Sequence, residues 1–204
     1  MTEEQRLIAR VLDGDQDAFA AIVTTHEKQV YNLCLRMVSD PEDAQDLAQE
    51  AFLKAWRGLR FYKFESAFST WLYRLTTNVC IDHLRRQKRR PQISLTMGEE
   101  EDEELDLPDT APLPEEQLLH GEDRRAVAEA MAQLDEESRA ILTLRIVEEQ
   151  SYEQIGEILD LKAGTVKSRI ARARGKLKNI LLKNGNFFEN MPSNHRERGM
   201  RREL

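Results

Sequence analysis

Residues 151–177, with the sequence SYEQIGEILDLKAGTVKSRIARARGKL, have the pattern of two short helices separated by a tight turn. We place the turn at residues 160–164, because Asp and Gly tolerate the left-handed backbone that a sharp reversal needs. Gly156 in the first helix is expected to let a neighbouring helix approach closely. Apolar residues at helical spacing would form the buried side of the pair: Tyr152, Ile155, Ile158, Leu159, Val166, Ile170, Ala173 and Leu177.

The other face of the second helix is basic. Seven cations and no acid lie between residues 162 and 178, whereas an ordinary solvated face usually interleaves both signs. Small residues, Ser168, Ala171 and Gly175, run along the middle of this face, with cations at its flanks. Such a helix suits the major groove of DNA, where bases are reached at the centre and phosphates at the edges. A solvated amphipathic helix pair is the alternative that this stretch alone leaves open.

The excess acid of the chain is concentrated in one interval. The 204 residues carry a net charge of −7, which disfavours a DNA partner until the charges are located. Ten acids and no Lys or Arg lie between Pro91 and Leu118, and the remainder has 27 acids against 30 bases. We therefore predict an acidic, flexible linker at residues 92–114 that joins two neutral-to-basic modules.

The predicted fold class is all-α, with two small helical domains, because no stretch shows the period-two alternation of a strand. In residues 1–91, apolar spacing predicts helices at 2–13, 17–38, 41–60 and 70–90. The third begins at Asp40-Pro41, a capping residue followed by Pro at the first helical position. Its predicted buried residues are Ala44, Leu47, Ala48, Ala51, Phe52 and Ala55 or Trp56. Residues 115–183 would form a second module of four helices, one of them starting at residues 135–137. Residues 184–204 would be a tail without periodicity.

Nothing in the sequence indicates an enzyme, a metal site or a membrane segment. There is no phosphate-binding glycine loop or catalytic triad, and the four His residues are scattered. Cys34 and Cys80 lack metal-ligand spacing, so we expect two buried, reduced thiols. No apolar run approaches the roughly 20 residues that span a bilayer, and the N-terminus is too polar for a signal peptide. We expect no cofactor, no metal, no catalysis and a cytoplasmic location.

Three segments resemble, in the correct order, the extracytoplasmic-function (ECF) sigma factors of bacterial RNA polymerase. Residues 43–56, DAQDLAQEAFLKAW, resemble region 2.2, and residues 68–86, FSTWLYRLTTNVCIDHLRR, resemble regions 2.3 and 2.4. Residues 134–177 resemble regions 4.1 and 4.2. The likeness, to the sigma-E and sigma-W types, extends to about residue 183. It implies a sigma factor that binds core RNA polymerase and directs promoter-specific initiation.

The resemblance gives the first module two roles. The outward residues of its third helix would dock on the clamp helices of the polymerase β′ subunit: Asp43, Asp46, Gln49 and Glu50. The loop after that helix and the exposed face of the next would open and read the −10 element, where a protein pocket must recover the cost of unstacking a base. The candidate contacts are Lys63, Phe64, Glu65, Ser66, Asn78, Asp82, Arg85 and Arg86. Phe64 stands where family loops often carry a small residue. Phe68, Trp71 and Leu72 are assigned to the core.

The second module would hold the −35 element as duplex. The family pattern maps onto Lys167, Ser168 and Arg172 for base edges and onto Thr165, Arg169 and Arg174 for phosphates. Lys176 is a further candidate, and Arg169 is near enough to the buried face to be structural instead. Residues 135–148 would touch the polymerase β flap, and the linker would thread toward the RNA exit channel. An anti-sigma factor that clamps both modules is also expected, and would hold the chain near the membrane.

A C-terminal helix pair of this kind also occurs in two other classes of protein. A LuxR-like regulator would use the same helix pair to bind duplex DNA alone, as a dimer, with the first module as a sensor. A recombinase would need a nucleophilic Ser or Tyr amid clustered arginines, and Tyr31, Tyr62 and Tyr73 have no such setting.

Overall fold

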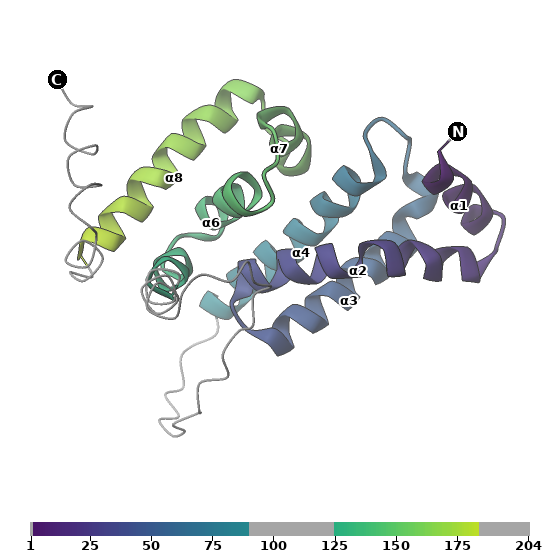
Figure 1. The fold of residues 1–204 in the computed structure, drawn as a ribbon, viewed down its shortest axis with the longest axis horizontal. Coiled ribbons are helices and arrows are strands. Elements are labelled where there is room, and N and C mark those ends of the chain that lie inside the picture. Colours follow the sequence, from purple (N-terminus) through teal and green to yellow (C-terminus); the bar gives the residue numbers. More distant parts are fainter. Residues whose placement is uncertain (1, 90–124, 184–204) are drawn as a thin grey trace, which may run out of the picture.

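The computed structural model describes residues 2–89 and 125–183, which form two helical modules (Figure 1). The first consists of α1 (Glu3–Leu12), α2 (Gln16–Val38), α3 (Pro41–Gly58), the 3-10 helix η1 (Leu59–Phe61) and α4 (Phe68–Arg89). The second consists of a helical segment at 125–132, α6 (Glu136–Leu142), the π-helical η2 (Thr143–Val147), α7 (Tyr152–Leu159) and α8 (Ala163–Lys183). No strand occurs in these ranges, and the all-α prediction is confirmed. The predicted linker at 92–114 and tail at 184–204 lie outside the described residues.

Side-chain caps fix where the helices of the first module begin. Asp40 accepts a hydrogen bond from the backbone N–H of Asp43 at 2.8 Å, and Pro41 occupies the first helical position, as predicted. Thr2 and Asp15 cap α1 and α2 in the same way. Each cap satisfies a backbone N–H that has no partner inside its helix.

The buried side of α3 is made mostly of alanines, which permit close packing against α2 and α4. Of the two alternatives left open by the sequence, Ala55 is buried, whereas Trp56 is 39% exposed. The Trp56 ring instead meets Phe19 edge-on, with the ring centroids 4.8 Å apart. The third helix therefore keeps a partly apolar outer edge.

The centre of α4 completes this core. Phe68 and Leu72 are buried, as predicted, and Trp71 packs against them partly exposed. Cys34 and Cys80 are both buried free thiols. A hydrogen bond with Cys34, together with burial, raises the pKa of the Cys80 thiol, so this thiol stays protonated at neutral pH.

The turn between α7 and α8 is made differently from the prediction in two details. Asp160 adopts the expected left-handed conformation, with φ of 55°. Gly164 does not; it lies in the first turn of α8. A Cβ at Gly156 would lie 2.7 Å from the carbonyl oxygen of Leu161 in the turn and 3.8 Å from Val166 Cγ2 of α8, so the turn approaches this glycine more closely than the neighbouring helix does.

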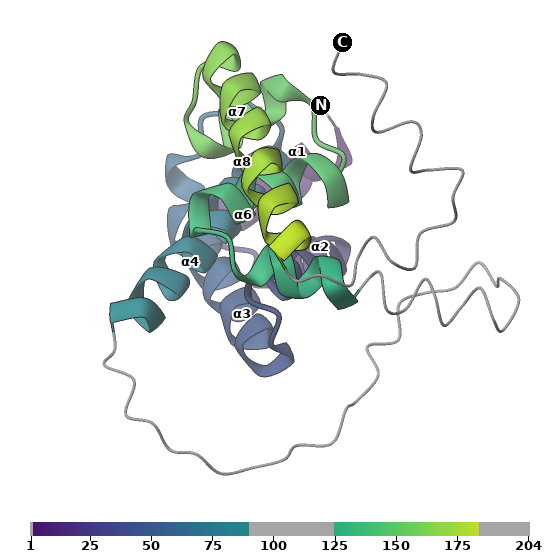
Figure 2. The same ribbon diagram turned by 90° about the vertical axis from the view of Figure 1, so that its left-hand side faces the viewer.

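The two modules pack against each other through α4, which lies beside α6 and α7 (Figure 1). Figure 2, turned by 90°, shows the second module in front of the first. The sequence predicted a tether between the modules and no contact surface. This packing turns one face of α4 toward the second module. Part of the candidate site lies between that face and the second module.

Candidate nucleic-acid interface

The basic face of α8 is solvent-exposed at its centre. Val166, Ile170 and Ala173 are buried against the module, which turns Lys167, Ser168 and Arg172 outward. The Arg172 Nε donates to the carbonyl oxygen of Ser168 at 3.4 Å, so the guanidinium lies along the exposed face. This arrangement leaves the three predicted base-reading side chains free to meet a groove.

Two other candidate cations of α8 are already paired with acids at the start of α6. Arg169 Nη1 lies 2.9 Å from Glu137 Oε2, and Lys176 Nζ lies 2.5 Å from Asp135 Oδ2. Asp135 is the N-cap of α6, as predicted, and accepts a hydrogen bond from the backbone N–H of Ser138. The seven predicted −35 residues thus fall into three groups. Lys167, Ser168, Arg172 and Arg174 point outward, and Thr165 is half-buried. Arg169 and Lys176 pair with acids and hold α8 to α6.

The predicted −10 loop is held by an aromatic cluster. The Tyr62 hydroxyl donates to the carbonyl oxygen of Ser66 at 2.6 Å, and its ring lies 4.7 Å from that of Phe64. Burial and the nearby Glu4 carboxylate raise the pKa of Tyr62. Phe64 has a φ of 59°, which is an outlier for a bulky side chain. Phe64 nevertheless remains 47% exposed.

The four α4 candidates do not share one surface. Asn78, Asp82 and Arg85 line a cleft of about 310 Å³, whose other wall includes Glu137 and Leu159 of the second module. Arg86, one turn after Asp82, lines a different cleft, next to α3. The structure therefore brings three of the predicted residues together and separates the fourth.

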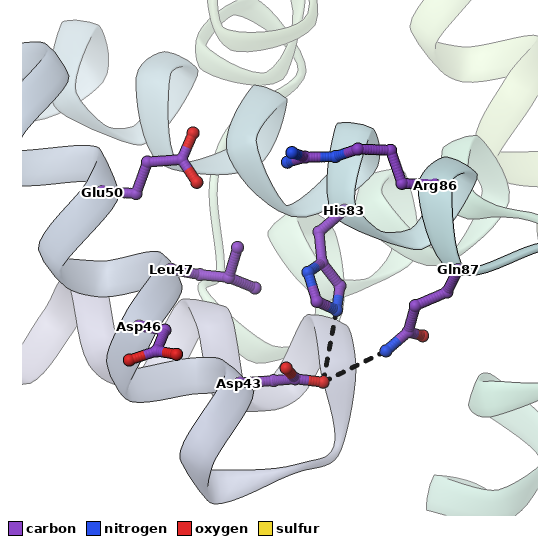
Figure 3. Close-up of a pocket in the computed structure, with 7 residues that line it drawn as sticks. All are labelled: Asp43, Asp46, Leu47, Glu50, His83, Arg86 and Gln87. Carbon is purple, nitrogen blue, oxygen red and sulfur yellow. Dashed lines mark hydrogen bonds and ion pairs between the residues drawn. The ribbon is translucent and has the colours of Figure 1, made fainter. Parts of the chain in front are cut away.

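The second cleft, of about 240 Å³, is lined by all three predicted polymerase-binding acids, Asp43, Asp46 and Glu50 (Figure 3). Asp43 Oδ2 accepts a hydrogen bond from Gln87 Nε2 at 3.1 Å and lies 3.2 Å from His83 Nε2. One oxygen of Asp43 is therefore engaged in holding α3 to α4. Asp46 and Gln49 remain exposed, and Glu50 pairs with Lys54.

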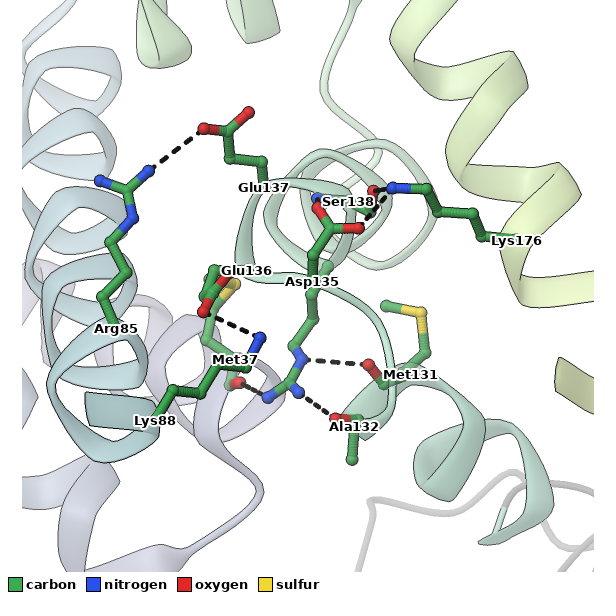
Figure 4. Close-up of polar contacts among 11 residues, drawn as sticks. Met37, Arg85, Lys88, Met131, Ala132, Asp135, Glu136, Glu137, Ser138 and Lys176 are labelled. Atoms are coloured by element: carbon green, nitrogen blue, oxygen red, sulfur yellow. Dashed lines mark hydrogen bonds and ion pairs between the residues drawn. The ribbon is translucent and has the colours of Figure 1, made fainter. Parts of the chain in front are cut away.

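Sequence reasoning missed one residue of this region, the buried Arg139 of α6. Its guanidinium donates to the carbonyl oxygens of Met131, at 3.0 Å, and Ala132 in its own module, and of Met37 in α2 at 2.8 Å (Figure 4). Burial lowers the pKa of Arg139, and the Glu136 carboxylate opposes this effect. The sequence did contain a signal for Arg139, which is the one cation inside the mostly apolar segment 138–144. A charge buried in such a segment requires hydrogen-bond partners, so its position predicts a structural contact.

Within the described ranges, no cluster of three or more His, Cys, Asp or Glu residues is arranged to hold a metal ion. No helix in those ranges is long and apolar enough to cross a membrane.

Comparison with known proteins gives matches to both modules. Residues 22–90 match the family model of sigma-70 region 2, and residues 124–177 match that of sigma-70 region 4. The chain is 41% identical over 176 residues to the RNA polymerase sigma-H factor of Pseudomonas aeruginosa, a match that covers 84% of this chain and 90% of the relative. It is 35% identical over 179 residues to the ECF RNA polymerase sigma factor SigW of Bacillus subtilis, covering 87% and 96%.

A solved structure shares the fold. The sigma factor RpoE from Bartonella quintana, crystallised with the anti-sigma factor NepR, aligns with a TM-score of 0.59 at 23% identity. The alignment covers 80% of this chain and 96% of that one.

Proposed function

The chain belongs to the sigma-70 family, in its extracytoplasmic-function branch, and on this basis we propose how its two modules divide the work of a sigma factor. It is a sigma factor that associates with core RNA polymerase and directs promoter-specific initiation. The observation that carries this function is that regions 2 and 4 both match, in order, one on each module. A LuxR-like regulator is not favoured, because region 2 is a polymerase-subunit module. The chemistry of RNA synthesis then belongs to the polymerase.

The second module is proposed to bind the −35 element as duplex through α8. The support is the exposed row of Lys167, Ser168 and Arg172, backed by a buried apolar side that holds the helix rigid. Arg offers paired donors that match the O6 and N7 acceptors of guanine in the major groove. Thr165 and Arg174, with Arg169 and Lys176 once these are released, would contact phosphates and fix the register.

The first module is proposed to capture the opened −10 strand. Phe64 supports this role, because its exposed ring beside Tyr62 offers a stacking surface for an unstacked base. A strained residue persists where its surroundings hold it, and here the Tyr62–Ser66 hydrogen bond closes the loop around Phe64. Lys63, Glu65 and Ser66 would line this pocket. The remaining candidates, Asn78, Asp82, Arg85 and Arg86, would continue the path along α4.

Core polymerase is proposed to bind elsewhere on the chain. The acidic face of α3, with Asp46 and Gln49 exposed and Asp43 and Glu50 beside them, would dock on the β′ clamp helices. Residues 135–148 would touch the β flap, where Ile146 and Val147 offer exposed apolar side chains. Separate acidic and basic surfaces would let one module bind protein and DNA at once.

We also propose an anti-sigma factor as a regulatory partner and the cytoplasm as the working compartment. Both follow from membership in the ECF branch, and an anti-sigma factor is the partner of the fold relative RpoE. For this chain the partner would have to cover surfaces on both modules.

The assignment of α3 can be tested by charge reversal. Asp46→Lys should weaken binding to purified core polymerase by about tenfold or more, because a like charge placed in a complementary interface costs several kcal/mol. Glu27→Lys, an equal charge reversal at an exposed position of α2, is the matched control and should bind as the unchanged chain does. Equal binding by both variants would refute the α3 surface without refuting the family assignment.

A further inference from the structure

The exposed ring of Phe64 is the outermost member of an aromatic cluster that reaches back into the first module. The ring centroid of Tyr62 lies 4.7 Å from that of Phe64 and 5.8 Å from that of Phe68. Trp71 packs on both Tyr62 and Phe68, with centroids 5.3 and 5.5 Å away. Ring pairs at these separations attract each other beyond the effect of their buried area. Three further rings therefore support the proposed stacking surface for an unstacked base.

The inner end of this cluster rests on His26 of α2. The imidazole centroid lies 5.5 Å from the ring centroid of Phe68, and the two ring planes are inclined by 57°. His26 is buried, with only 8% of its surface exposed. An imidazole in such a position needs a hydrogen-bond partner as well as an aromatic neighbour, because its polar atoms have lost most of their water.

Glu4 of α1 supplies that partner. Its Oε1 lies 2.9 Å from His26 Nε2. Because a carboxylate only accepts hydrogen bonds, the Nε2–H of His26 is the donor. Burial and the charge of this same carboxylate raise the pKa of the Tyr62 hydroxyl, so Glu4 also lies within electrostatic reach of that group. Glu4 therefore adjoins the cluster at two points, through His26 and beside Tyr62.

α1 is fixed on the module by its own packing. Ile8 and Val11 are buried, and a capping box closes the first turn, which carries Glu4. The helix also contacts η1, which leads directly into the loop of Phe64. α1 precedes residues 22–90, which match sigma-70 region 2, so that match assigns it no role. Its position makes it a support for the loop.

The loop needs support because Phe64 is strained. Its φ of 59° lies in the left-handed region, which a bulky side chain rarely adopts. The Tyr62 hydroxyl closes the loop by donating to the carbonyl oxygen of Ser66, and that hydrogen bond depends on where the Tyr62 ring lies. A Tyr62 ring that shifts would lose the bond and release Phe64 from a conformation that only its surroundings maintain. Holding the cluster in place therefore holds the stacking ring in place.

We propose that Glu4 and His26 are positioning residues for capture of the opened −10 strand. Through Phe68 and Tyr62, they hold the loop in the conformation that presents the Phe64 ring to an unstacked base. Neither of them touches DNA, since His26 is buried and the charge of Glu4 repels phosphate. The inference rests on the proposed function, because it takes Phe64 as the stacking surface.

The expected effect is modest, because one partner of the pair is partly exposed. The Glu4 side chain keeps 37% of its surface accessible, against 10% for His26. A pair of this kind is worth about two- to fivefold in an equilibrium. The affinity for a base falls with the fraction of chains whose loop is in the competent conformation. Loss of the pair should therefore weaken base capture by this factor and leave the other DNA contacts unchanged.

Glu4→Ala removes the acceptor of His26, and Glu3→Ala is the matched control. Both glutamates lie in the first turn of α1, and Glu3 is exposed. Holoenzymes with each variant are compared on two forked fragments of a promoter from which the unchanged holoenzyme initiates. Both fragments carry the −35 element as duplex and the −10 strand unpaired, and in the second fragment the −10 strand has abasic sites. The ratio of the two affinities measures base capture alone.

Glu4→Ala should lower this ratio by about two- to fivefold relative to Glu3→Ala, with the affinity for the abasic fragment unchanged. Glu4→Gln should recover most of the ratio, because its amide oxygen still accepts a hydrogen bond from His26. An equal loss on both fragments would mean that Glu4 only stabilises the fold. Tighter binding of both fragments would mean that Glu4 acts only by repelling DNA. Either result, or an unchanged ratio, overturns the inference.

Hydrogen exchange in the free chain tests the loop without DNA. The backbone N–H of Tyr62 donates to the carbonyl oxygen of Leu59 at 3.0 Å. Peptides that cover residues 59–67 should exchange about two- to fivefold faster in Glu4→Ala than in Glu3→Ala, whereas peptides from α8 should exchange equally. Equal exchange of the loop peptides in the two variants would contradict the positioning role.

Phe64→Ala separates this inference from the proposed function. If this variant keeps the full affinity ratio, Phe64 does not stack a base, and the proposed capture site fails together with the inference. If Phe64→Ala lowers the ratio and Glu4→Ala does not, the capture site stands and the inference alone fails. A lower ratio in both variants, with Glu3→Ala unchanged, is the result that we expect.

Discussion

Two neighbouring arginines of α8 are expected to differ in what they recognise. Arg172→Ala should weaken binding to the cognate −35 duplex by about 1–3 kcal/mol and relax discrimination at one base pair. Arg174→Ala should weaken binding to all duplexes about equally and lower the salt dependence, because a phosphate contact carries no sequence information. Holoenzyme affinities for the promoter and its single-base-pair variants measure both effects. Unchanged discrimination in Arg172→Ala would rule out its base-reading role.

The charge of Asp135 gives the second module a pH dependence. Burial raises the pKa of Asp135, but hydrogen bonds from Lys176 and Ser138 outweigh burial and hold it at about 2, below the ordinary 3.8. A depressed pKa stabilises the fold above the pKa of the unfolded chain and loses this effect as pH falls through the folded value. The contribution at pH 7 is about 1 kcal/mol after screening of an exposed pair.

Asp135→Asn isolates this contribution, because Asn retains the capping ability and removes the charge. Denaturant unfolding should show the variant less stable by about 1 kcal/mol at pH 7. The difference should shrink below pH 4 and fall to about half near pH 3. A difference that stays constant across this range would mean that the Lys176 pair does not stabilise the fold.

At the level of single side chains, the sequence predicted the outward row of α8 well, because helical spacing alone decides which residues face away from Val166 and Ile170. It did not predict the partners of Arg169 and Lys176. Those partners, Glu137 and Asp135, lie more than 30 residues earlier in the chain, and only the packing of α6 on α8 brings them near.

Among the helices, the α7–α8 turn has a glycine whose role is testable. Gly156→Ala would place a Cβ 2.7 Å from the backbone carbonyl oxygen of Leu161, and such overpacking costs about 1–3 kcal/mol. Gly175→Ala is the control, because nothing lies within 4 Å of its added Cβ. It should raise stability by about 0.5–1 kcal/mol, since Ala replaces Gly in a helix interior. Thermal unfolding measures both effects. Midpoint temperatures that shifted in the same direction for the two variants would contradict the close packing at Gly156.

Helix starts were predictable because their chemistry is local: Asp40 and Asp135 cap the helices that follow them. The π-helical Thr143–Val147 was not predicted, since one inserted residue leaves the apolar pattern nearly unchanged. The prediction for the turn was correct for Asp160, which adopts the left-handed conformation. It was wrong for Gly164, which lies in α8, because Asp160 already provides the left-handed residue that the turn needs.

The local sequence pattern carries no information on how the two modules pack against each other. The sequence therefore predicted a tether between them and no contact surface. Three acids at residues 135–137 look in the sequence like an ordinary helix start. In the folded chain they meet cations of both α4 and α8. Negative charge therefore lies directly beside the proposed DNA-reading helices, at the start of α6.

The most direct test of the central claim is transcription of bacterial genomic DNA by purified core RNA polymerase, with and without this chain, followed by sequencing of the RNA 5′ ends. A sigma factor with two promoter-reading modules should create new start sites that share one −35 motif and one −10 motif at fixed spacing. The same start sites with and without the chain, or new sites without a shared motif, would contradict the assignment.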